Sequence, residues 1–158
     1  MGHNMKYSKP KNPRYIDEVM PPDIFDKFKN KLAHQFYITI PKYGIIDVLV
    51  WKNSNTVQHI YNGGYKGTCK KNERVQAFVT RYKSNGNQIG VLHLDVNNID
   101  LNVLAHECVH LGYALFIKKN WKIRTTNKSE ETMAYFIGDI FTAIHEILLK
   151  LSVKIKPK

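Results

Sequence analysis

The amino-acid sequence predicts an α+β fold in which a small sheet precedes two long helices. Residues 36–96 contain short runs rich in Val, Ile, Tyr, Phe and Thr, separated by turn-forming residues, as expected of strands. Residues 100–151 place apolar side chains at intervals of three and four, as expected of helices. Because the chain has 158 residues and is 43% hydrophobic, we expect one domain, with only residues 1–12 disordered.

A first helix is expected at about residues 22–34. Pro21 and Pro22 precede Asp23 as they would at a first helical turn, and apolar residues then recur at helical spacing. The expected strands span residues 36–40, 45–51, 56–61, 75–82 and 88–96. We expect these strands to form an antiparallel or mixed sheet, with a hairpin turn at residues 84–87.

The last third of the chain predicts two helices. Asp100 can cap a helix that runs to Ile117 and includes Gly112. The second helix is expected to start near Ser129, whose hydroxyl is a good cap, and to continue to about Leu151.

Composition and charge exclude several classes of protein. No stretch reaches the roughly 18–20 uninterrupted apolar residues of a membrane span, and the N-terminus lacks the apolar run of a secretory signal. We therefore expect a cytoplasmic protein with no membrane contact. Two cysteines, Cys69 and Cys108, are too few for a disulfide scaffold. The net charge of +11 favours an anionic partner, but the lysines are scattered, so only weak nucleic-acid association is expected.

The first of the two C-terminal helices contains a metal-binding pattern. His106, Glu107 and His110 form an H-E-x-x-H sequence. Residues four apart lie on one face of a helix, so both imidazoles can bind one zinc ion at about 2.0–2.1 Å. Glu107 lies one residue further on, where it can reach a metal-bound water as a general base without being a ligand.

A catalytic zinc needs a third protein ligand. No histidine occurs at residues 111–121, which excludes the metzincin form of the motif. A carboxylate on the following helix remains, and the residues alone leave four candidates: Glu130, Glu131, Asp139 and Glu146.

Three segments carry a resemblance to known proteins: LAHECVH at 104–110, ETMAYFIG at 131–138 and IHE at 144–146. They resemble short metallopeptidases encoded by bacteriophages and prophages, in which A-H-E-x-x-H is followed about twenty residues later by E-x-x-A-Y-x-x-G. More distantly, the pattern is similar to the minimal gluzincins, zincin-like zinc peptidases whose downstream helix carries E-x-x-A. The resemblance covers about residues 100–150.

The resemblance implies His106, His110 and Glu131 as ligands of Zn²⁺, with Glu107 as general base and acid. It also implies that the small residues Ala134 and Gly138 let the second helix pack closely on the first. Larger gluzincins place an Asp four residues after the ligand Glu, and this chain has Tyr135 there. The Tyr135 hydroxyl is either a catalytic donor to a ligand or substrate oxyanion, or simply part of the core.

The first functional hypothesis is a zinc metallopeptidase acting on proteins or peptides in the cytoplasm of a host bacterium. Tyr135, Tyr113 or His93 would stabilise the oxyanion. The strand at residues 88–96 would border the cleft, and an extended peptide would add to its edge by main-chain pairing. The second hypothesis is a zincin-fold phage accessory or virion binding protein without turnover. The third is a basic DNA-associated protein with a protease site.

Overall fold

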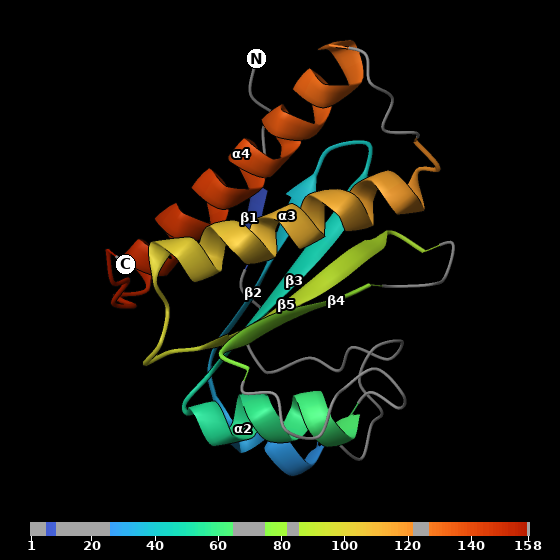
Figure 1. Ribbon diagram of the computed structural model, residues 1–158. Coiled ribbons are helices and arrows are strands. Elements are labelled where there is room, and N and C mark those ends of the chain that lie inside the picture. The colour runs from blue at the N-terminus through green and yellow to red at the C-terminus, as the bar shows by residue number, and fades with distance from the viewer. Residues whose placement is uncertain (1–5, 9–25, 65–74, 82–85, 122–126, 158) are drawn as a thin grey trace.

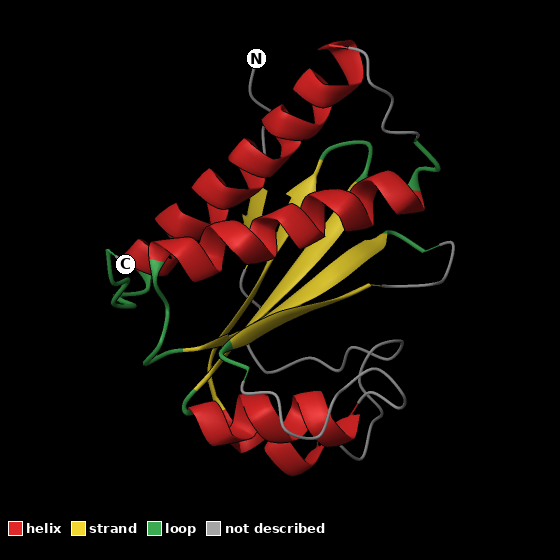
Figure 2. Cartoon of the chain, in the orientation of Figure 1, coloured by secondary structure: helices red, strands yellow, loops and turns green. Residues whose placement is uncertain are grey.

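The computed structural model describes residues 6–8, 26–64, 75–81, 86–121 and 127–157 (Figure 1). These residues form a mixed sheet with helices on both faces, so the fold is of the α+β class (Figure 2). The strands are β1 (Lys6–Ser8), β2 (Leu32–Ile40), β3 (Gly44–Trp51), β4 (Ala77–Arg81) and β5 (Gln88–Asp95). The helices are α2 (Ser54–His59), α3 (Leu101–Lys118) and α4 (Asn127–Lys150).

The strand order in the sheet is β1-β2-β3-β5-β4. β2 pairs antiparallel with β1 and β3, and β4 pairs antiparallel with β5, which confirms the expected antiparallel β4–β5 pairing. β3 and β5 are parallel. Parallel neighbours need a crossover connection, and the chain makes this one through α2 and β4. Residues 84 and 85 of the expected turn lie outside the described residues.

The strand expected at residues 56–61 is wrong, because α2 and a π-helical turn (Ile60–Gly64) occupy this segment. The side chain of Asn53 caps α2 by accepting a hydrogen bond from the backbone N–H of Thr56 at 2.9 Å. Val57 and Ile60, three residues apart, are both fully buried. Spacing of three suits one face of a helix, so tertiary packing overrides the β propensity of this segment.

The N-terminal segment also differs from expectation. Lys6–Ser8 form an edge strand on β2 within the segment that was expected to be disordered. Of the helix expected at 22–34, only a short helical turn at residues 26–28 and a 3₁₀ turn (Lys29–Lys31) lie in the described part, and β2 begins at Leu32. Phe36, Ile38 and Ile40 are buried at every second position, which is strand periodicity.

The two C-terminal helices agree with the sequence prediction. The carboxylate of Asp100 caps α3 by accepting a hydrogen bond from the backbone N–H of Val103 at 2.7 Å. α4 begins at Asn127, two residues before the predicted cap Ser129. Judged by length and composition alone, α4 is long and apolar enough to cross a membrane. A core helix meets the same criteria, and α4 places Phe136, Ile140 and Ile144 in the interior of this fold.

Two hydrophobic cores lie on the two faces of the sheet. The larger one joins the sheet to α3 and α4. The smaller one lies on the α2 side and contains Phe28, Leu49, Trp51, Val57, Ile60, Phe78 and Val91. β3 serves both cores, because Val48 and Val50 face α3 whereas Leu49 and Trp51 face α2. Burial on both faces explains why residues 48–51 of this strand are a continuous apolar run.

Candidate metal centre

His106 and His110 lie side by side on the exposed surface of α3. Their Nε2 atoms are 3.2 Å apart, and the ring planes meet at 70°. Both side chains are exposed. The helix that Asp100 starts therefore brings together the two residues that the H-E-x-x-H spacing predicted to be neighbours.

The separation of these nitrogens fits two ligands of one zinc ion. Two nitrogens that each lie about 2.05 Å from a tetrahedral ion are about 3.3 Å apart. The same 3.2 Å separation also suits a hydrogen bond between two neutral imidazoles, one donating N–H and the other accepting. The pair thus has the spacing that zinc requires before any ion is bound.

Glu107 is buried, in contrast to the histidines on either side of it. Its side chain is 7% exposed. Glu107 lies one turn before Leu111, which packs over Gly90 of β5, so the carboxyl group faces the sheet side of α3. Burial raises the pKa of the Glu107 carboxyl, and the charge of His106 partly opposes that rise. A carboxyl group with a raised pKa is a stronger base.

Glu131 does not join the histidine pair. Within the described ranges, no three His, Cys, Asp or Glu side chains gather in a group that could hold a metal ion. The contact between the helices explains the separation: a Cβ atom at Gly112 would lie 2.6 Å from Cγ1 of Ile137 and 3.3 Å from Sδ of Met133. Glu131 precedes Met133 by two residues, or about 200° around the helix, so it points away from α3 and is exposed.

The other three residues that define the E-x-x-A-Y-x-x-G pattern are also exposed. Ala134 is exposed, Tyr135 is 50% exposed, and a Cβ atom at Gly138 would have no neighbour within 4 Å. The close helix contact that the resemblance assigned to Ala134 and Gly138 is made instead by Gly112 of α3. Tyr135 is half exposed, so it is not part of the core. It also lies away from the side of α4 that meets α3, so the structure does not bring its hydroxyl to the histidine pair.

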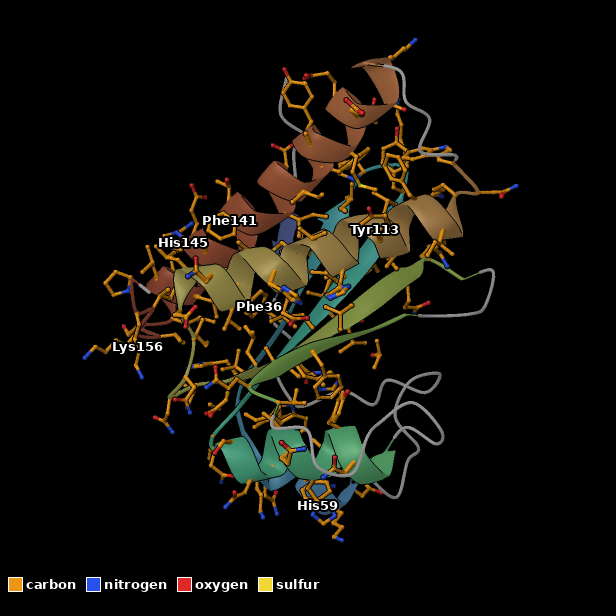
Figure 3. All side chains as sticks on the ribbon, viewed as in Figure 1. Phe36, His59, Tyr113, Phe141, His145 and Lys156 are labelled. Atoms are coloured by element: carbon orange, nitrogen blue, oxygen red, sulfur yellow. The ribbon has the colours of Figure 1, made fainter. Side chains whose placement is uncertain are left out.

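The remaining candidate carboxylates also lie on α4. Glu130 and Glu146 are exposed, and Asp139 is half-buried. None of them forms a metal-binding group with the histidines among the residues described. His145, half-buried on α4, stacks on Phe141 with ring centroids 5.7 Å apart (Figure 3).

His93 lies on the opposite face of the sheet from α3. Its Nδ1 accepts a hydrogen bond from Nε1 of Trp51 at 3.1 Å, and its ring stacks on Phe78 at 4.3 Å between centroids. Complete burial lowers the pKa of His93 to about 3. The expectation that His93 could stabilise an oxyanion at the histidine pair is therefore wrong, because the sheet lies between them. No local feature of the sequence predicts this aromatic stack, because it depends on pairing between β3, β5 and β4.

The strand that borders the helix also differs from expectation. β5 was expected to present a free edge for an extended peptide, but it is paired on both sides, with β3 and with β4. β4 is the edge strand on this side of the sheet. Among the described strands, β4 is therefore the one that offers a peptide this edge of the sheet.

Within the described part of the chain, Cys108 and the lysines form no further site. Cys108 is fully buried, and burial is the main cause that raises the pKa of its thiol to about 12, whereas Cys69 lies outside the described residues. Exposed lysines occur in separate places. Lys27, Lys29 and Lys31 lie around Phe28 and Asp26, and others follow α4 at the C-terminus. Nucleic-acid association remains a prediction.

Comparisons with protein-family models, with curated proteins and with solved structures each found no match to this chain. The candidate site is thus defined by the geometry of α3 and by the sequence pattern.

Proposed function

We propose that this chain is a zinc-dependent metallopeptidase of the minimal gluzincin type, in which His106, His110 and Glu131 hold the ion and Glu107 moves the proton. The observation that carries the proposal is the 3.2 Å separation of the two Nε2 atoms on an exposed helix face, with Glu107 next to them in the chain. Because a hydrogen bond between two neutral imidazoles has the same spacing, the proposal depends on the exposed position and on Glu107 as well as on the distance.

The chemistry follows from the groups present. When bound, zinc supplies a Lewis acid that polarises a peptide carbonyl and lowers the pKa of a water molecule. Glu107 accepts a proton from the attacking water and returns it to the leaving amine. Burial on the sheet side of α3 holds the Glu107 carboxyl beside the ligand face and limits its contact with bulk water.

Glu131 enters the proposal through the sequence pattern. To reach the histidine pair, it needs α4 to turn a different side toward α3 from the one that carries Met133 and Ile137, and to pack on the side of α3 that carries the histidines rather than Gly112. Ala134 and Gly138 lie on the same side of α4 as Glu131, three and seven residues after it, and their small size suits a close helix contact. Binding of the ion would favour that arrangement over the one described above.

The proposal is tested by titrating the purified protein with Zn²⁺ in a calorimeter. We expect about one ion per chain, and a large loss of affinity in His106→Ala and His110→Ala because each removes one ligand. Glu131→Ala should lose affinity, whereas its matched control Glu130→Ala should not. Zinc binding that is unchanged in all four variants would contradict the proposal. Loss in Glu130→Ala alone among the carboxylate variants would reassign the third ligand.

A zincin-fold binding protein without turnover is the second candidate. The observation that favours it is the absence, among the residues described, of a third ligand beside the histidine pair. A cleavage screen of a host lysate with the zinc-loaded wild-type protein separates the two candidates. New peptide termini support the peptidase, and their absence with intact zinc binding supports the binding protein.

A further inference from the structure

The exposed face of α3 carries no charged side chain around the histidine pair. Between residues 105 and 117, the exposed residues are Ala105, His106, Val109, His110, Tyr113 and Ile117. The chain as a whole is 23% charged and has a net charge of +11, so an uncharged helix face is unusual within it. We call these six residues the α3 outer face.

Apolar side chains on this face are well exposed to solvent. Val109 is 38% exposed, Tyr113 is 46% exposed and Ile117 is 58% exposed. His106, His110, Tyr113 and Ile117 follow one another at spacings of four, three and four, which places them in a single line along the helix. Tyr113 therefore lies about 4.5 Å beyond His110 along the helix axis, and Ile117 about 10 Å beyond it.

The size of the α3 outer face indicates what covers it. A stable interface between folded proteins uses about 20–30 residues on each side, far more than this face supplies. Its length suits a short extended chain, because residues 106–117 span about 16 Å along the helix and a strand covers that distance in about five residues. Its lack of charge suits uncharged side chains, because a charged one would lose hydration there without gaining a partner.

We propose that the α3 outer face is the specificity surface for the peptide substrate. The substrate lies extended along α3, with its scissile bond at the histidine pair. Tyr113 and Ile117 contact large apolar side chains located one to three residues from that bond. This inference rests on the proposed function, since it assigns the substrate class of the same site.

The test combines cleavage with binding. Zinc-loaded wild-type protein is incubated with a randomised peptide library, and the products are sequenced by mass spectrometry. We expect enrichment of Leu, Ile, Phe and Tyr one to three residues from the cleaved bond. Tyr113→Lys and Ile117→Lys should each lower kcat/KM for such peptides about 10- to 100-fold, the usual range for losing an apolar contact. Leu149→Lys, an equally exposed apolar position on α4, is the control and should leave kcat/KM unchanged.

A binding arm separates failure of this inference from failure of the proposed function. Zinc-loaded Glu107→Gln protein is titrated with fluorescent Ala-Ala-Leu-Leu-Ala-Ala and with its Ala-Ala-Glu-Glu-Ala-Ala counterpart. We expect the leucine peptide to bind more tightly than the glutamate peptide, and we expect this preference to be lost when Tyr113→Lys is combined with Glu107→Gln. That result supports the α3 outer face as the specificity surface even if the wild-type protein cleaves nothing. Cleavage without apolar preference, or a preference unchanged in both lysine variants, overturns the inference and leaves the peptidase standing. Tyr113→Ser and Ile117→Ser, with zinc affinity and circular dichroism as fold controls, replace any lysine variant that does not fold.

Discussion

α3 and α4 pack on the same hydrophobic core, but their exposed faces differ in charge. α3 has seven exposed residues, and none is Asp, Glu, Lys or Arg. α4 has ten exposed residues among those whose side chains are described, and five are charged. The charged ones are Lys128, Glu130, Glu131, Glu146 and Lys150. The other five exposed residues of α4 include the large side chains of Tyr135 and Leu149, so the two helices differ in exposed charge and not in whether they expose apolar side chains.

The difference in exposed charge indicates which of the two helices carries the candidate site. The H-E-x-x-H residues lie on the helix whose exposed face carries no charge, whereas Glu131 and Tyr135 lie on a helix of which half the described exposed residues are charged. In the arrangement described, the chemistry of the site belongs to α3. α4 contributes to it only if its packing on α3 changes.

The largest expected effect concerns Glu107 on the buried side of α3. Glu107→Gln should lower peptide hydrolysis by about 10²- to 10⁴-fold, because an amide fills the same space but cannot accept a proton. Zinc affinity and thermal stability should stay close to those of the wild type, since the proposal gives Glu107 no ligand role. Steady-state cleavage assays on the zinc-loaded proteins measure this. A cleaved substrate that Glu107→Gln processes at the wild-type rate would show that the proton moves by another route.

His93, on the face of the sheet that neither α3 nor α4 covers, should make the free energy of unfolding depend on pH in acid. His93 has a pKa of about 3 in the folded protein and about 6.5 when unfolded. Between these values the unfolded chain binds a proton that the folded chain excludes, so the free energy of unfolding falls as the pH is lowered. The fall reaches about 1.4 kcal/mol per pH unit from this group.

Urea unfolding of the wild type and of His93→Gln at several pH values between 7.5 and 4 checks this. Gln cannot titrate, so the variant should be less sensitive to acid. Its carbonyl oxygen can still accept the hydrogen bond from Trp51, but the ring that stacks on Phe78 is lost, so the variant should be less stable at neutral pH. Equal pH slopes for the two proteins would show that groups other than His93 cause the acid sensitivity.

The helices were predictable from sequence because their signals are local. The cap at Asp100 and the apolar spacing placed α3 to within one residue at its C-terminal end, and the histidine pair followed from helix geometry alone. α2 was missed because Thr56, Val57, Ile60 and Tyr61 are good strand formers, and the only local sign of a helix is the cap at Asn53.

The parts that could not be predicted depend on contacts between distant segments. The parallel pairing of β3 with β5 depends on a crossover connection, and no short stretch of sequence predicts it. The position of Glu131 relative to the histidines depends on how α4 is rotated about its axis and on which side of α3 it packs against. Two sets of residues can support the close approach: Ala134 and Gly138 on one side of α4, or Met133 and Ile137 against Gly112. The sequence pattern favours the first and the structure has the second.

Two glycine substitutions test which side of α4 packs against α3. Their expected effect, on the free energy of unfolding, is the smallest of those predicted. Gly138→Ala should raise the free energy of unfolding by up to about 1 kcal/mol, because alanine is the better helix former and its Cβ meets nothing within 4 Å. Gly112→Ala makes the same change in helix propensity but places a Cβ 2.6 Å from Cγ1 of Ile137, a β-branched side chain with little freedom to move. Overpacking of this kind costs about 1–3 kcal/mol.

We therefore expect Gly112→Ala to be less stable than Gly138→Ala by about 1–3 kcal/mol in zinc-free protein, measured by urea unfolding. The reverse order would show that α4 meets α3 through Ala134 and Gly138 without any metal.

Gly112→Ala and Gly138→Ala also test the role of Glu131. If zinc turns α4 so that Glu131 reaches the histidines, Gly138→Ala becomes the crowded substitution and should weaken zinc binding, while Gly112→Ala should strengthen it by disfavouring the zinc-free packing. Zinc affinity that neither alanine changes would mean that α4 keeps one packing throughout and that the third ligand is not Glu131.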